Sequence, residues 1–503
     1  MLGTKMLAGA IALGFGVAAH AQTKWDMPTP YPDGNFHTKN VRQFAEDIAK
    51  STGGKLQIQV HSNGSLIKHP EIKRAVQTSQ VPIGEVLISV LSNESPLFAF
   101  DSNPFLANSY PKEEKLWQAA KPHIVKRLDG QGIQLLYSVP WPPQGLYAKK
   151  EINSLADLKG TKFRTYSPTT SRFAELVGAI PTTIQVPDIP QAFRTGLVDA
   201  MITSGATGVD SQAWDYLQYY YDTQAFLPQN MVIVSKAAFR KLDSATQKAL
   251  LEAAKAAEPR GWKTSESENA GYEDDGRAWH QDHEAELEAL VRLRGDRPPD
   301  GGRMGEESRR RRRGDPQGLP GQVSLSAMRA ALELLYKTSG FAAGFFLVAI
   351  GALTAVQILG RLLGFAAYSF DDFAGFSMAA SSFLGLAYTL RANEHIRMTL
   401  VLHHTRPALR RALEIVCLAI AALLVGLFAW FTCDMTLTSF ELGDVSQGLV
   451  PVPLWIPQSG MALGLVVLTV AFVDDLVATL RGQRTSYAIA EAQHGADMPT
   501  FER

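Results

Sequence analysis

The sequence predicts an exported α/β domain followed by an all-α bundle of four transmembrane helices. Strand-like and helix-like patterns alternate up to about residue 275, and four long apolar stretches lie between residues 338 and 480. A short apolar segment typical of an export signal begins the chain. The 503 residues carry no net charge, but this average conceals unlike regions, so each region has to be interpreted separately.

Residues 1–21 predict a cleaved signal peptide. Lys5 precedes an apolar stretch at residues 6–18, and Ala19 and Ala21 are the small residues that a signal peptidase requires. A short buried helix is the alternative, but three glycines weaken it, and polar residues follow at once. We therefore expect the domain at residues 22–275 to work outside the cytoplasm.

Periodicity places the elements of this α/β domain. Alternating apolar and polar residues or short apolar runs predict strands at residues 55–61, 86–90, 134–139, 162–166 and 231–234. Helical spacing predicts helices at residues 41–49, 72–77 and 237–257. This alternation is typical of a parallel or mixed sheet covered by helices. It leaves two folds open, a single doubly wound enzyme domain and a two-lobed binding protein.

Motifs for catalysis and cofactor binding are missing from the sequence. It has no GxGxxG after a strand, no GxxxxGK[ST], no GxSxG and no HExxH. The only cysteines, Cys417 and Cys433, share one apolar run, so neither a disulfide framework nor a CxxC site is expected. We predict no metal and no cofactor.

Three segments, matched in order along the chain, give a more specific indication of the class of protein. They read GSLIKHPEI at residues 64–72, INSLADLKGTKFR at 152–164 and AFRTGLVDA at 192–200. These segments resemble the solute-binding P subunits (DctP-type) of tripartite ATP-independent periplasmic (TRAP) transporters over most of residues 24–265. The resemblance implies an α/β two-lobed periplasmic solute-binding fold that closes over an organic acid. It implies capture of a ligand and no enzymatic activity.

The resemblance also assigns candidate ligand-binding residues. Arg164 ends the DLKG.K.R pattern, whose arginine pairs with the substrate carboxylate in that family, and its planar fork suits two parallel hydrogen bonds. The alternative is an ordinary arginine paired with an acidic side chain. A second anchor, asparagine in relatives, falls on Thr203 and Ser204, whose hydroxyls also donate. A further arginine of some relatives falls near Gln144, which leaves the identity of the acid open.

Aromatic side chains are candidates for the apolar walls of the cleft. Trp141, between two prolines, and Trp214, soon after the Thr203–Ser204 turn, are the preferred candidates. For the tyrosines, packing in the core is favoured, and Tyr166 is retained as a candidate.

Residues 276–327 fit neither neighbouring region. They are rich in Arg, Gly, Asp, Glu and Pro, include five consecutive arginines at 309–313, and cannot bury enough apolar surface to form a core. We favour a mis-joined reading between two adjacent coding regions over a solvated linker. Nucleic-acid or anionic-lipid binding is the least favoured interpretation, and no nucleic-acid partner is expected. The P-subunit pattern deteriorates here, so the C-terminal part of the binding domain is expected to be truncated or altered.

Four apolar stretches, at residues 339–359, 373–390, 413–431 and 454–473, each have about the 20 residues that cross a bilayer as a helix. A soluble helical domain would need polar faces, which these stretches lack. Basic residues crowd the loop between the second and third stretches, whereas Asp371, Asp372 and residues 441–444 make the other two loops acidic. We therefore expect both termini and the basic loop to be cytoplasmic, with residues 486–503 as a cytoplasmic tail.

Residues 328–485 resemble the small membrane Q subunit (DctQ-type) of the same transporters. NEHIR at residues 393–397 and PLWIP at 453–457 carry this resemblance. It implies a lipid bilayer, the bacterial inner membrane, and a large membrane (M) subunit as partner. Thr399 stands where relatives often have an acidic residue, and His403 and His404 lack a third metal ligand nearby.

The two predicted parts conflict in topology. An exported first domain and a first helix that begins in the cytoplasm require one membrane crossing between residues 275 and 338. Residues 327–336 are amphipathic and too short, and the arginine run is costly to translocate. We predict that the parts are not naturally one polypeptide, with Met328 as an independent start; inverted insertion is the alternative. A membrane-tethered sensor and an extracytoplasmic enzyme are the competing functions.

Overall fold

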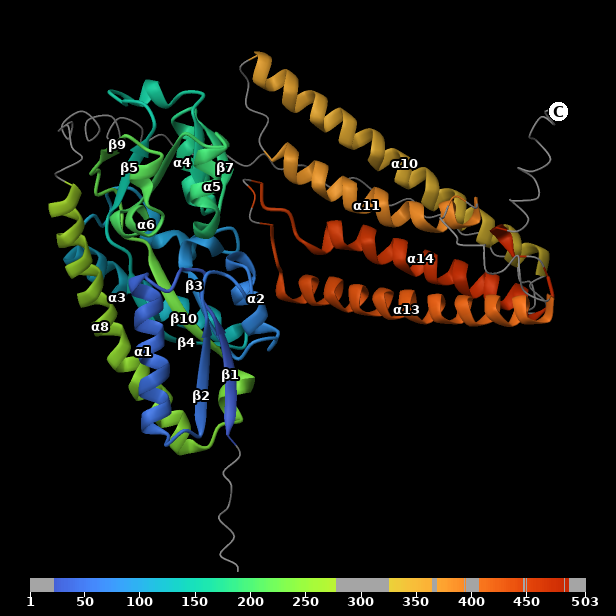
Figure 1. Ribbon diagram of the computed structural model, residues 1–503, viewed down its shortest axis with the longest axis horizontal. Helices are drawn as coiled ribbons and strands as arrows, with labels where there is room; N and C mark the ends of the chain where they lie inside the picture. Colours follow the sequence, from blue (N-terminus) through green and yellow to red (C-terminus); the bar gives the residue numbers. More distant parts are fainter. Residues whose placement is uncertain are drawn as a thin grey trace, which may run out of the picture.

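The computed structural model describes residues 22–276, 325–363, 369–392, 394, 407–446, 448, 450–483 and 485–487. These form a soluble α/β domain and a bundle of four long helices beside it (Figure 1). The predictions for the signal peptide, for nearly all of the junction, and for the NEHIR segment apart from Glu394 lie outside the described residues. Those for Thr399, His403 and His404 lie outside them as well.

Lobe 1 of the soluble domain contains the first strands of the chain and the last one. Its sheets are a parallel pair, β1 (Thr23–Pro28) with β2 (Leu56–His61), and an antiparallel sheet in the order β3 (Ile83–Leu87), β10 (Gln229–Ser235), β4 (Ile133–Pro140). Its helices are α1 (Phe36–Ser51), α2 (Ile72–Gln77), α3 (Tyr110–Gly130), α7 (Lys236–Arg240) and α8 (Ser244–Gly276). Because α8 packs on α1 and β4, the end of the domain returns to its first lobe.

Lobe 2 is formed by the middle of the domain. Its five-stranded sheet has the order β7 (Ile180–Thr183), β6 (Lys162–Thr165), β8 (Ala200–Ser204), β5 (Gln144–Ala148), β9 (Tyr219–Tyr221). Its helices are α4 (Pro168–Leu176), α5 (Ile189–Arg194) and α6 (Gly205–Asp210). The chain passes between the lobes from β4 to β5 and again from β9 to β10. The two-lobed α/β alternative is thus the correct one.

Most predicted elements of this domain are present with small shifts of their ends, and two are wrong. The strand predicted at residues 86–90 ends at Leu87, and Ile88–Leu91 form a 3-10 helix. All of these residues are buried, so apolar periodicity cannot separate the two states. The single helix predicted at residues 237–257 is two helices, because Asp243 accepts the backbone N–H of Thr246 (2.9 Å) and starts α8 anew.

Four helices long and apolar enough to cross a membrane form the second domain, as predicted. They are α10 (Leu325–Leu363), α11 (Phe370–Arg391), α13 (Pro407–Leu442) and α14 (Trp455–Leu480). Residues 327–336, expected to be a separate short amphipathic segment, are instead the first part of α10. The apolar run of α10 continues that segment without a break, and the helix therefore starts earlier than hydropathy alone indicates.

The bundle turns its large apolar side chains outward and packs through small residues. Phe341 is 81% exposed and Trp430 72%, as suits contact with lipid. At Gly464 a methyl group would lie 2.4 Å from the backbone carbonyl carbon of Phe383, so α14 and α11 meet backbone to backbone. The Ser339 hydroxyl donates to the Leu384 carbonyl (2.6 Å) and joins α10 to α11.

The soluble domain contacts one end of this bundle. Arg74 on α2 forms an ion pair with Asp444 (3.2 Å), and the Asn93 amide donates to the carbonyls of Ser446 and Gly448 (both 2.9 Å). These partners lie in the acidic loop between α13 and α14, which is the loop predicted to be outside.

The first turns of α10 lie at the far end of the bundle, where Arg329 donates to Gln483 (2.6 Å) beyond the end of α14. The soluble domain and the start of α10 therefore lie at opposite ends of the bundle. The topological conflict itself stays a prediction from the sequence.

Candidate ligand-binding cleft

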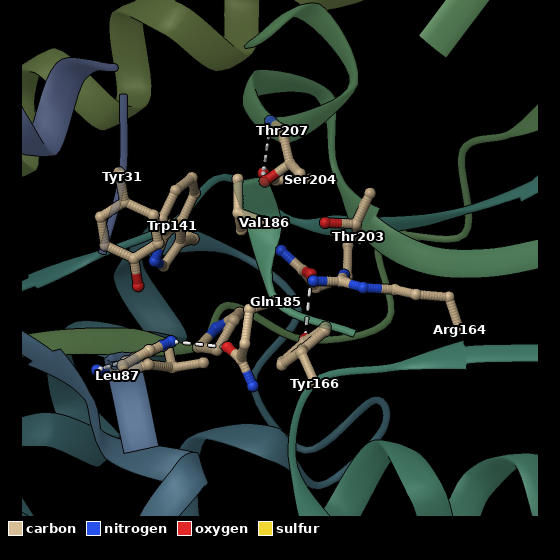
Figure 2. A pocket seen from close by; sticks show the side chains of 13 residues that line it. Tyr31, Leu87, Trp141, Arg164, Tyr166, Gln185, Val186, Thr203, Ser204 and Thr207 are labelled. Carbon is tan, nitrogen blue, oxygen red and sulfur yellow. Dashed lines mark hydrogen bonds between the residues drawn. The ribbon is translucent and has the colours of Figure 1, made fainter. Parts of the chain in front are cut away.

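A cavity between the lobes gathers side chains from both. It has about 340 Å³ of empty space, including the part open to solvent. Its lining consists of Tyr31, His69, Leu87, Trp141, Gln144, Arg164, Tyr166, Gln185, Val186, Thr203, Ser204, Thr207 and Pro228. In Figure 2, Arg164 and Thr203 lie on one side of the cavity, and Tyr31 and Trp141 on the other. Six of the seven residues predicted for the site are therefore in one place.

Arg164 is the largest fully buried side chain of the described residues, with an exposed fraction of 1%. It stands on β6, and its Nε donates to the Ile184 carbonyl (2.9 Å), while its Nη1 has no hydrogen-bond partner among the described residues. Burial lowers the pKa of Arg164 to about 10, so the side chain is still charged at neutral pH. No carboxylate of the described residues pairs with it, and an unpaired buried charge is costly. The geometry calls for an anion from outside.

Tyr166 and Gln144 support this arginine. The Tyr166 ring lies 4.9 Å from the guanidinium carbon of Arg164, a cation–π contact, and its hydroxyl donates to Gln144 Oε1 (3.1 Å). Gln144 Nε2 in turn donates to the Pro142 carbonyl (3.0 Å). Both ends of the Gln144 amide are thus occupied within the protein, and Gln144 holds Tyr166 beneath the arginine.

The two predicted hydroxyl residues differ in the hydrogen bonds that they already make within the protein. Ser204 Oγ accepts the backbone N–H of Thr207 (3.2 Å) and caps α6. Thr203 is the last residue but one of β8, and its hydroxyl has no hydrogen bond to any described residue. Thr203 therefore has a hydroxyl available to a ligand, whereas Ser204 serves chiefly to shape the turn.

The structure places the two candidate tryptophans differently with respect to the cavity. Trp141 is buried, donates from Nε1 to Asn230 (2.9 Å), and meets the Tyr31 ring edge-on at 4.8 Å between centroids. Trp214 is 47% exposed, lies in a short 3-10 helix after α6, and does not line the cavity. The prediction for Trp214 is wrong in its placement, because Gln212 adopts a left-handed conformation (φ 52°) where the chain leaves α6 and turns.

Sequence reasoning missed Thr207 on α6 and three further polar or aromatic lining residues, Tyr31, His69 and Gln185. His69 stands within the GSLIKHPEI segment, so a signal for it existed. Tyr31 and Gln185 come from loops in which no pattern marks them.

Two buried carboxyl groups lie where the chain crosses between the lobes. Gln229, the first residue of β10, donates its backbone N–H to Asp101 (2.8 Å) and its side-chain amide to Glu113 (2.6 Å). Burial raises the pKa of Asp101 to about 7; burial and the nearby Asp101 raise that of Glu113 to about 9. Both groups therefore keep a proton to a higher pH than exposed carboxyl groups do, and Glu113 keeps it above neutral pH.

Fold and cleft together define a class of protein: a two-lobed extracellular receptor for an anion, joined to a membrane component. Residues 29–286 match the family described as bacterial extracellular solute-binding protein, family 7. Residues 350–482 match the DctQ component of the tripartite ATP-independent periplasmic transporters. The chain belongs to the family 7 solute-binding proteins and carries a DctQ domain in the same sequence, as the sequence predicted.

Solved relatives agree with this assignment. DctP7 of Bordetella pertussis, an extracytoplasmic solute receptor binding pyroglutamic acid, is 54% identical, with a TM-score of 0.51, over 52% of this chain and 86% of that one. DctP6 of the same organism, also described as binding pyroglutamic acid, is 50% identical, with a TM-score of 0.50, over 50% of this chain and 84% of that one. A marine metagenome TRAP solute-binding protein specific for pyroglutamate is 40% identical, with a TM-score of 0.52, over 54% of this chain and 90% of that one.

A more distant relative is the solute-binding protein of Albidiferax ferrireducens. It is 25% identical over 35% of this chain and 52% of its own length, so the chain spans about half of that protein. These relatives are solute-binding proteins rather than enzymes.

Proposed function

We propose that this chain captures a small cyclic organic acid, pyroglutamate or a close analogue, outside the cytoplasm for a TRAP-type secondary transporter. The observation that carries the proposal is Arg164, a buried cation with no anionic partner among the described residues. A ligand carboxylate supplies the missing charge and accepts hydrogen bonds from the guanidinium. The relatives described as binding pyroglutamate support the choice of acid.

The remaining lining residues suit a compact ligand. Thr203 offers a hydroxyl next to the arginine, while Trp141, Tyr31 and Val186 offer apolar surface for the body of the ligand. Capture then consists of closing two lobes over the ligand, and no bond is broken.

For the membrane domain, we propose a supporting role beside a large M subunit in the bacterial inner membrane. The match to the DctQ component and the four apolar helices support this proposal. The M subunit would supply the transport path, driven by an ion gradient.

Calorimetric titration of the detergent-solubilised full chain with pyroglutamate tests the capture proposal. We expect binding by the wild type and, with Arg164→Met, a loss of affinity of about 30-fold or more, because truncating one partner of a buried charge pair costs about 2–5 kcal/mol. Arg172→Met is the matched control, since Arg172 is 64% exposed on α4. If Arg164→Met binds as tightly as the control, the anchoring role is refuted; if the wild type fails to bind, the choice of acid is refuted.

A further inference from the structure

Two hydrogen bonds cross the cleft and join the lobes. His69, in the 3-10 helix His69–Glu71 of lobe 1, bonds through Nδ1 to Gln185 Oε1 of lobe 2 at 3.0 Å. Asn35, just before α1 in lobe 1, donates its side-chain amide to Asp210 at the end of α6 in lobe 2, at 2.5 Å. The two lobes are therefore in contact across the cleft, and lobes that moved apart would lose these bonds.

The direction of the His69 bond follows from its second partner. The backbone N–H of Leu87, which is solely a donor, points at His69 Nε2 at 3.1 Å, so this nitrogen carries no proton. The neutral ring then has its proton on Nδ1 and donates it to Gln185. Burial lowers the pKa of His69 to about 4, which agrees with a neutral ring. The Gln185 amide is thereby oriented with Oε1 toward the histidine.

The segment to which His69 is hydrogen-bonded also accepts a hydrogen bond from the anchoring arginine. Ile184, the neighbour of Gln185, accepts the Nε–H of Arg164 at 2.9 Å. Because His69 uses Gln185 Oε1, the two N–H groups of Gln185 Nε2 remain without a partner among the described residues, and Gln185 lines the cavity. One closing contact therefore fixes both the carbonyl that orients the guanidinium and an amide donor for a ligand oxygen.

We propose that His69 is a positioning residue that latches lobe 2 onto lobe 1 through Gln185 and so slows release of the bound acid. The proposal rests on the proposed capture function and adds to it a determinant of the lifetime of the complex. His69 acts through Gln185 and the adjoining peptide rather than through the carboxylate itself. The second cross-cleft bond, Asn35 to Asp210, remains when the latch is lost, and it therefore limits the expected increase in the release rate.

Stopped-flow tryptophan fluorescence of the full chain with pyroglutamate tests the latch. His69→Leu removes the Nδ1 donor, and Gln185→Leu removes the acceptor. For each, we expect a dissociation rate about 2- to 10-fold higher, as for one lost hydrogen bond, and an association rate within about 2-fold of wild type. The double variant should dissociate no faster than the faster single variant, because both substitutions break the same bond. His61→Gln is the control, since His61 lies outside the cleft on β2.

A readout without ligand separates the latch from the choice of acid. Fluorescent labels at the exposed positions Lys50 on lobe 1 and Arg172 on lobe 2 report the distance between the lobes, in a chain whose two cysteines are serines. We expect a larger closed fraction in wild type than in Gln185→Leu, even if pyroglutamate is not bound. Equal closed fractions, unchanged dissociation rates, or dissociation effects that add in the double variant would overturn the latch.

Discussion

The soluble domain and the membrane domain place their large side chains in opposite ways. In the soluble domain the interior holds the big side chains, Arg164 among them, because burial of apolar surface from water drives that fold. In the bundle, Phe341 and Trp430 face outward, and Gly464 lies at a helix contact. Lipid removes the hydrophobic drive between helices, so close fit of small residues takes its place. A buried charge thus marks a candidate ligand site in the soluble domain, and a buried glycine marks a helix contact in the membrane domain.

The largest expected effect concerns whether the two domains share one chain in the cell. We predict two smaller products, because the sequence between the two domains has no apolar segment that could make the required membrane crossing, and its arginine run is costly to translocate. Immunoblotting of the native host with antibodies against each domain measures this, and Met328→Ala should abolish the smaller membrane product. A single band of full length would contradict the prediction.

A substitution at the helix contact tests the membrane half of the comparison. Gly464→Ala would place a methyl group 2.4 Å from the backbone of α11, where no side chain can move aside. We expect a loss of about 1–3 kcal/mol in the unfolding free energy of the bundle, as for overpacked cores. Unfolding in a denaturing detergent followed by circular dichroism measures it. Gly351→Ala, with nothing within 4 Å, is the matched control and should show no such loss.

An effect spread over several pH units tests the soluble half. Because the pKa of Glu113 is raised to about 9 in the folded domain, the fold binds a proton that the unfolded chain releases near pH 4.5. Stability should therefore fall as pH rises from about 5 to 9, by at most about 1.4 kcal/mol per pH unit for this group. Glu113→Gln should flatten that fall in urea unfolding curves, whereas the exposed Glu46→Gln should leave the slope as in wild type.

The sequence predicted the features of this molecule that depend on local pattern. The strand that carries Arg164 and the four apolar helices were found because periodicity or a contiguous segment marks them. Trp214 was misplaced because closeness in sequence to Thr203 does not say which way the chain turns after α6. The bond between His69 and Gln185 joins residues 116 positions apart, and the carboxyl groups of Asp101 and Glu113 meet only at Gln229. Such contacts arise from the folding of the lobes and have no local signature.

Arg74 and Asn93, which bind the loop between α13 and α14, both belong to lobe 1, whereas Arg164 belongs to lobe 2. Lobe 2 can therefore move away from lobe 1 without breaking the contacts between lobe 1 and the membrane domain. The contacts that hold the soluble domain to the membrane domain are therefore separate from those that close the cleft.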